Sequence, residues 1–121
     1  MWPTRLSRTQ EQGRQWEDVA LAYLGRHGIV LVEANFRCKP GEIDLILRDG
    51  ATLVFVEVRQ RAADAQVSAS ASTGPAKIRR IVRAAQVYLQ RFDRLPPCRI
   101  DVVAIDGEDI EWIRNAIEAG V

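Results

Sequence analysis

The sequence has only one histidine, two cysteines and two lysines among its 121 residues, and the first two of these shortages each exclude a class of site. Cys38 and Cys98 lie far apart and form no C-x-x-C pair, which argues against a zinc ligand set. His27 precedes Gly28 at an expected helix end, where the helix dipole favours a cationic ring. A histidine-rich metal centre and a Ser-His-Asp triad are therefore not supported.

Long apolar runs are also missing, since no segment approaches the roughly 18 apolar residues that a membrane span requires. The first fifteen residues, MWPTRLSRTQEQGRQ, contain no apolar segment of the kind that directs secretion. We therefore expect a cytoplasmic protein without membrane association. The length and an apolar content of 47% predict one domain over residues 1–121, with residues 1–8 as a flexible N-terminus.

Acidic and basic residues are unevenly distributed, although the net charge is only +1. Residues 77–99 contain seven basic side chains and one acidic side chain, whereas residues 100–121 contain six acidic and one basic. A local basic stripe can bind a polyanion even on a nearly neutral protein. A solvated helix face explains the same charges equally well.

Hydrophobic periodicity and turn residues predict the order of the secondary structure. The predicted elements are a helix over 9–27, strands over 29–37, 42–48 and 52–59, a helix over 75–91, a strand over 98–106, a short strand over 110–113 and a helical turn over 114–119. Residues 62–74, AADAQVSASASTG, are mostly small and polar, and they predict a mobile loop. The order α-β-β-β-α-β-(β)-(α) predicts an α/β fold with a central mixed β-sheet flanked by helices.

The segment GEIDLILRDGATLVFVEVRQR, residues 41–61, reads as a β-hairpin with charged residues inside both strands. If residues 49–50 form the turn, Arg48 opposes Ala51 and Asp44 opposes Phe55. One face then carries Glu42, Asp44, Ile46, Leu53, Phe55, Glu57 and Arg59, and the other carries Ile43, Leu45, Leu47, Val54, Val56 and Val58. The second face is continuously apolar, so we expect it to be buried.

This register makes Asp44 and Glu57 diagonal neighbours, with backbones roughly 7–8 Å apart. Two carboxylates at that distance repel each other unless a cation lies between them, and Mg²⁺ or Mn²⁺ accepts such oxygen ligands. The backbone carbonyl of Val58 is a candidate third ligand, and Arg59 projects from the same face toward a phosphate. The alternative is an ordinary charged surface that faces solvent.

The same segment resembles the signature of the YraN-like family of small bacterial proteins, in which GEIDLI is followed by a short turn and an FVEVK-like strand. The resemblance extends over most of the chain, through GRQWEDVALAYLGRHG, VLVEANFRC, GPAKIRRI and CRIDVVAI. That family is similar to the restriction-endonuclease-like PD-(D/E)xK superfamily and, within it, to archaeal Holliday-junction resolvases. The resemblance implies a restriction-endonuclease-like fold, Mg²⁺ or Mn²⁺ as cofactor, DNA as partner and a homodimer.

Carried over to this chain, the resemblance makes Asp44 and Glu57 the metal ligands and Glu17 the additional glutamate of the first helix. The chain departs from the family pattern at Arg59, where the motif has a lysine. Arginine keeps its proton and grips phosphate, so it cannot take over a proton-transfer role. Three alternatives remain: Arg59 acts electrostatically, Lys77 supplies the missing ammonium group, or the site is catalytically inactive.

The residues expected to contact nucleic acid are Gln60, Arg61, Lys77, Arg79, Arg80 and Arg83. Contacts of arginine and lysine with phosphates give affinity without sequence choice. The predicted function is a nucleic-acid-binding protein that acts as a divalent-metal-dependent endonuclease on branched or structured DNA. The alternatives are a catalytically inactive nucleic-acid-binding module and a protein-interaction module that uses the acidic segment from Glu108 to Glu118.

Overall fold

The computed structural model describes residues 8–61 and 74–117. Its elements are α1 (Arg8–Gly25), β1 (Val30–Cys38), β2 (Gly41–Asp49), β3 (Thr52–Arg61), α2 (Pro75–Leu89), β4 (Cys98–Asp106) and β5 (Asp109–Ile117). The α/β class is confirmed, and the first six elements begin and end within two residues of their predicted bounds. The predicted flexible N-terminus and mobile loop fall almost entirely on residues 1–7 and 62–73, outside the described residues.

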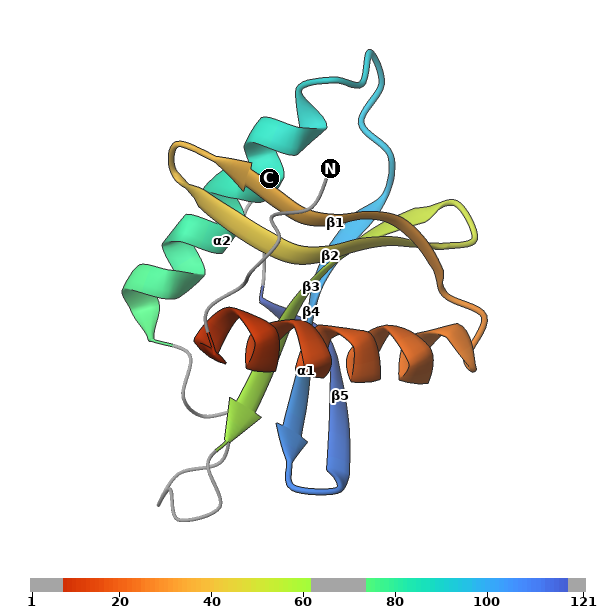
Figure 1. Cartoon of the computed structure of the whole chain (residues 1–121). Helices are drawn as coiled ribbons and strands as arrows, with labels where there is room; N and C mark the ends of the chain where they lie inside the picture. The colour runs from red at the N-terminus through yellow and green to blue at the C-terminus, as the bar shows by residue number, and fades with distance from the viewer. Residues whose placement is uncertain (1–7, 62–73, 118–121) are drawn as a thin grey trace.

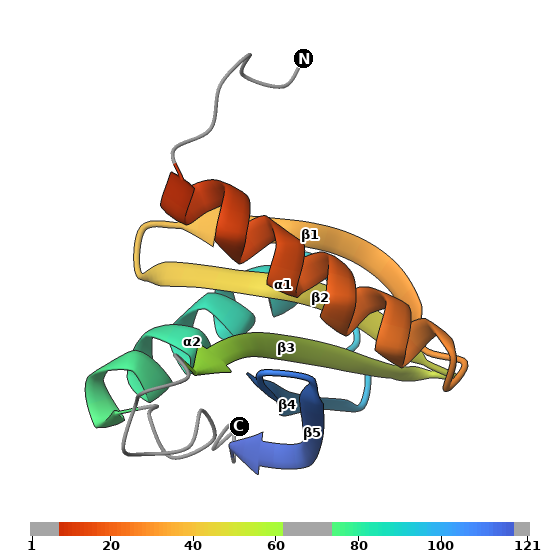
Figure 2. The same cartoon turned by 60° about the horizontal axis from the view of Figure 1, so that its bottom comes forward.

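The five strands form one open sheet in the order β1-β2-β3-β4-β5. All neighbours are antiparallel except β3 and β4, whose parallel pairing requires the crossover that α2 provides. Figures 1 and 2 show α1 lying across one face of the sheet and α2 across the opposite face. Within the described part of the chain, neither helix is long and apolar enough to cross a membrane.

Each helix covers a separate hydrophobic cluster. The cluster under α1 contains Ala20, Leu24, Ile29, Leu45, Leu47, Val54, Val56, Val103 and Ile105. The cluster under α2 contains Ile43, Ile46, Leu53, Phe55, Ile81, Ala84, Ala85, Tyr88, Leu89, Ile100, Val102 and Ile117. Successive residues of β3 therefore enter different cores, as the two-residue period of a strand requires.

The predicted hairpin register is wrong, because each residue of β2 pairs with a β3 residue two positions further along than predicted. Asp49 opposes Thr52 and Arg48 opposes Leu53, so the two turn residues are Gly50 and Ala51. Gly50 has a φ of 60°, and glycine at the first turn position is the arrangement used by type II′ hairpins. Because the shift moves each residue to a partner two positions along, it preserves which side chains share a face.

Ile43 is the exception to the predicted faces, since it packs in the cluster under α2 instead of sharing a face with Leu45. The β2–β3 pairing ends at Leu45 and Val56, and beyond this point β2 separates from β3. In the neighbouring strand, Asn35 has a φ of 56°, a conformation that asparagine tolerates and that interrupts the regular alternation. The β1–β2 turn consequently lies beside α2 (Figure 1).

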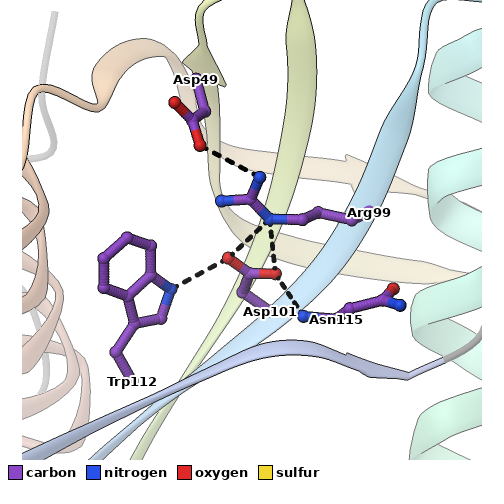
Figure 3. A network of polar contacts seen from close by, with 5 residues as sticks. All are labelled: Asp49, Arg99, Asp101, Trp112 and Asn115. Carbon is purple, nitrogen blue, oxygen red and sulfur yellow. Dashed lines mark hydrogen bonds and ion pairs between the residues drawn. The ribbon is translucent and has the colours of Figure 1, made fainter.

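The predicted helical turn over 114–119 is wrong for residues 114–117, which belong to β5. The β4–β5 register shifts between Ile100 and Val102, and Asn115 on the facing strand has a φ of 51°. Its backbone N–H donates to Oδ1 of the buried Asp101 at 2.8 Å (Figure 3). The Asp101 carboxylate thus accepts the backbone N–H of the irregular residue Asn115, and β5 continues beyond it.

Candidate functional site

Asp44 lies where β2 leaves β3. Regular pairing of the two strands extends from the turn as far as Leu45 and Val56, and Asp44 is the first residue of β2 outside it. Beyond this point the Asp44 carboxylate, instead of a backbone carbonyl, accepts the N–H of Val58, with Oδ2 at 2.8 Å from the nitrogen. The separation of the strands therefore provides the space that the half-buried carboxyl group occupies.

The carboxyl groups of Asp44 and Glu57 lie close enough to interact electrostatically. Burial and, next, the negative charge of Glu57 raise the pKa of Asp44 to about 8, against the lowering effect of the Val58 N–H. The raised pKa favours the protonated form of Asp44 at neutral pH. The structure thus brings the two predicted carboxyl groups together, just beyond the point where regular β2–β3 pairing ends, rather than as diagonal neighbours within that pairing.

Glu57 is almost fully buried and contacts two cations in addition to Asp44. Lys77 Nζ, from the first turn of α2, lies 3.1 Å from Glu57 Oε1. Arg59 Nη1 lies 3.5 Å from the same oxygen. The side chain of Glu57 is only 5% exposed, so its carboxyl group is poorly hydrated, whereas the side chain of Lys77 is 39% exposed. The structure therefore brings together an ammonium group and a guanidinium group at the carboxyl pair.

Glu17, on α1, is close enough for its charge to raise the pKa of Asp44. Its own pKa is raised by burial, while a hydrogen bond with Asn35 lowers it and nearby Glu42 raises it. Asn35 is also the residue with the left-handed conformation in β1. Its hydrogen bond with Glu17 therefore connects α1 to β1 near Asp44.

Within residues 8–61 and 74–117, no three acidic, histidine or cysteine side chains are grouped so that they could hold one metal ion. The fit to a metal therefore depends on Asp44 and Glu57 alone. Mg²⁺ is often held by one or two carboxylates and several waters, so a two-carboxylate donor set is compatible with it. A cation bound between the two groups would relieve their mutual repulsion.

A cavity of about 410 Å³ opens beside this cluster on the α2 side of the sheet. Its lining residues are Arg37, Cys38, Gly41, Glu42, Asp44, Glu57, Lys77, Arg80 and Ile81. The β1–β2 turn and the N-terminal half of α2 supply most of this wall. Acidic and basic groups therefore face each other across a space large enough for a small polar ligand.

The remaining predicted residues occupy different surroundings. Gln60 is exposed on β3, and Arg61 is the last residue of that strand. Arg79 and Arg83 are exposed on α2 and do not line the cavity, whereas Arg80 does. The predicted basic face is therefore divided between the cavity and the outer surface of the helix.

Sequence reasoning missed several residues of the site, among them Arg37 and Asn35. Both lie on β1, whose bend toward α2 depends on the left-handed conformation of Asn35. Asparagine is enriched at such positions, and this preference is the only local signal that the sequence offers. Nothing in the local sequence predicts that Arg37 lines the cavity, because its position there depends on the bend of β1.

Comparison with known proteins gives a consistent result. A model of "Uncharacterised protein family UPF0102" matches residues 16–105. A UPF0102 protein of Janthinobacterium sp. (strain Marseille) is 54% identical over 114 residues, which cover 93% of each chain. The UPF0102 protein of Herminiimonas arsenicoxydans is 50% identical over 121 residues, covering 97% of this chain and 98% of the relative. A UPF0102 protein of Cupriavidus metallidurans is 56% identical over 115 residues, covering 94% and 86%.

Proposed function

The chain belongs to the uncharacterised protein family UPF0102, and from this membership and the geometry of the site we propose that it is a nucleic-acid-binding endonuclease. The proposed substrate is branched or structured DNA, cleaved at phosphodiester bonds. The proposal includes a restriction-endonuclease-like fold, supported by the mixed sheet with a helix on each face. It also includes a homodimer, because a four-way junction offers two symmetric cleavage points.

The observation that carries the proposal is the pair of neighbouring carboxyl groups of Asp44 and Glu57, with Lys77 3.1 Å from Glu57, at the wall of a cavity. A carboxyl group whose pKa is raised to about 8 by burial and by a specific charged neighbour, in such a position, is typical of a functional site.

In this proposal the carboxylates of Asp44 and Glu57 and the backbone carbonyl of Val58 hold Mg²⁺ or Mn²⁺. The bound ion supplies a Lewis acid that offsets charge developing on the phosphate. Glu17 adds negative charge near Asp44 and orients a water molecule. Each of these groups lies on a different segment, so the sheet and α1 together fix their relative positions.

The two cations have different roles because their side chains differ in shape and charge distribution. Lys77 places an ammonium group beside Glu57, and it therefore takes the place of the motif lysine. Arg59 keeps its charge and stabilises the phosphate through its guanidinium group. Gln60, Arg61, Arg79 and Arg83 contact the neighbouring backbone of the nucleic acid.

The proposal is tested by incubating a labelled four-way junction and a linear duplex with the protein and Mg²⁺ or Mn²⁺. The parent chain is expected to cleave the junction, and Asp44→Asn to reduce the rate by roughly 100-fold or more. Lys77→Met should also reduce the rate, whereas Arg59→Lys should raise it. Asp109→Asn, which changes an exposed aspartate on β5, serves as the matched control. Equal cleavage by the parent and Asp44→Asn would show that the activity does not come from this site.

One observation favours a second candidate, a nucleic-acid-binding module without catalysis. Glu57 is already balanced by both Lys77 and Arg59, so the cluster is electrically satisfied without a metal ion. This candidate predicts junction binding by the parent, by Asp44→Asn and by Arg59→Lys, with no cleavage by any of them. A titration with Mn²⁺ monitored by electron paramagnetic resonance separates the candidates, since only the endonuclease needs a site that Asp44→Asn weakens.

A further inference from the structure

The β1–β2 turn and α2 touch through their backbones at Gly41 and Arg80. A Cβ atom on Gly41 would lie 2.8 Å from the carbonyl oxygen of Arg80 and 3.1 Å from its Cβ. The first distance is shorter than non-bonded atoms tolerate, so only glycine allows this approach. Both residues line the cavity.

Arg80 differs from the other two cations that line the cavity. Arg37 forms an ion pair with Glu42 at 3.3 Å, and Lys77 forms one with Glu57 at 3.1 Å. Arg80 has neither an ion pair nor a side-chain hydrogen bond with any residue in the described ranges. Its backbone is nevertheless held against Gly41, so the exposed Arg80 extends from a fixed base without a side-chain partner among residues 8–61 and 74–117.

The size of the cavity limits what the guanidinium can meet there. A volume of about 410 Å³ is at the lower end of the range for small-molecule sites. A base-paired duplex cannot enter such a space, whereas a nucleotide taken out of the helical stack can.

We infer that the cavity binds one unpaired nucleotide of the substrate, with its phosphate between Arg80 and Lys77. This inference rests on the proposed function and specifies its substrate, which has an unpaired nucleotide next to the scissile bond. Arg79 and Arg83 lie outside the cavity and contact flanking phosphates without regard to pairing. The arginines of α2 therefore act at two distinct places.

The test uses the full chain in EDTA, so that cleavage and metal binding play no part. Thymidine 5′-monophosphate is titrated and followed by backbone amide shifts, with thymidine as the probe that lacks phosphate. We expect the amides of Gly41 and Lys77 to shift with the nucleotide. Arg80→Ala should raise the dissociation constant about tenfold or more, as the loss of a charge-assisted hydrogen bond predicts. Arg79→Ala, the matched control, should change it less than about twofold.

A second arm compares a labelled single-stranded oligonucleotide with a blunt duplex as competitors for the bound nucleotide. Displacement by the single strand and not by the duplex supports the inference. Equal effects of Arg79→Ala and Arg80→Ala, or equal displacement by the duplex, overturn it. Junction cleavage in Mg²⁺ without nucleotide binding also overturns it and leaves the proposed function intact. Nucleotide binding without any cleavage supports the inference while removing the endonuclease proposal.

Discussion

Asp44 and Glu57 lie where burial makes a doubly ionised pair costly. The pKa of Asp44, about 8, lies far above its ordinary value of 3.8. The Val58 N–H favours ionisation of Asp44, whereas Lys77 and Arg59 contact Glu57. The pair is therefore a position where the folded protein gives up stability in order to keep two carboxyl groups in contact.

This cost predicts a pH dependence of stability. Between pH 4 and pH 8 the folded state binds more protons at Asp44 than the unfolded state does, so the free energy of unfolding falls as pH rises. Asp44→Asn removes this contribution and keeps a group that can accept from Val58 N–H and donate to Glu57. We expect the variant to gain roughly 1–3 kcal/mol over the parent at pH 8 and much less at pH 5.

Urea unfolding in EDTA at both pH values measures this difference. Asp18→Asn is the control, because it makes the same substitution at an exposed aspartate of α1. A gain of the same size at pH 5 and pH 8 would contradict the assignment of the proton to Asp44.

Two glycines make a second residue-scale comparison. Gly41→Ala introduces a Cβ 2.8 Å from a backbone oxygen of α2, which can move only together with the helix. We expect a loss of about 1–3 kcal/mol in the free energy of unfolding. Gly25→Ala places its Cβ in open space at the end of α1 and should be neutral or stabilising by about 0.4–1 kcal/mol. Thermal and urea unfolding of both variants measure the contrast, and equal effects would mean that the turn can shift away from α2.

At the scale of elements, the sequence predicts helices and strands well because their periods are explicit. The stripe of α1 and the alternation in β3 identify which side chains are buried. The turn at Gly50 was misplaced by one residue, because the Asp-Gly pair signals a turn without specifying which of its residues form the corner. The prediction that Asp44 and Glu57 lie close together is unaffected by this error, because a shift of two positions does not change which side chains share a face.

The end of the chain and the bend at Ile43 were not predictable for a different reason. Both depend on single asparagines in left-handed conformations, Asn35 and Asn115, whose consequences appear only after partners from other strands are in place. The segment RNAIEA has helix-favouring composition, and pairing with β4 overrides that preference. Tertiary contacts therefore decided what local propensity left open.

Asp101 is the contact that holds β5 in this arrangement. Its carboxylate accepts from Trp112 Nε1 at 2.9 Å, from Asn115 N–H at 2.8 Å and from Arg99 Nε at 3.1 Å (Figure 3). Arg99 also pairs with Asp49 at 3.1 Å, so the network joins β4, β5 and the end of β2. Removing the carboxylate leaves a mostly buried guanidinium without its main counter-charge.

We therefore predict that Asp101→Ala lowers the free energy of unfolding by about 3–5 kcal/mol. Asp101→Asn, which keeps an acceptor, should cost less. Hydrogen exchange provides the local measurement, since the amide of Asn115 should lose protection first. Glu111→Ala, at an exposed position of the same strand, is the control. Unchanged protection at Asn115 would mean that β5 is held by its apolar contacts alone.

At the scale of the whole molecule, the two-faced sheet separates a structural side from a chemical side. The side under α1 is closed by an apolar cluster, and the side under α2 combines a second cluster with the cavity. The net charge of +1 conceals exposed arginines on α2, next to that cavity. A polyanion would therefore approach one side of the protein, with little attraction over the rest of the surface.

This charge distribution predicts how affinity for DNA depends on salt. Each phosphate neutralised by a basic side chain contributes about −0.9 to the slope of log K against log salt. Changing Arg79 and Arg83 together to Gln should make the slope shallower by roughly 2 and weaken binding to junctions and duplexes alike. The pair Arg48→Gln and Arg94→Gln, exposed but outside the proposed contact surface, should leave the slope unchanged. Fluorescence anisotropy at several salt concentrations measures both. A flat salt response in the parent chain would instead favour a protein-interaction module and would contradict nucleic-acid binding.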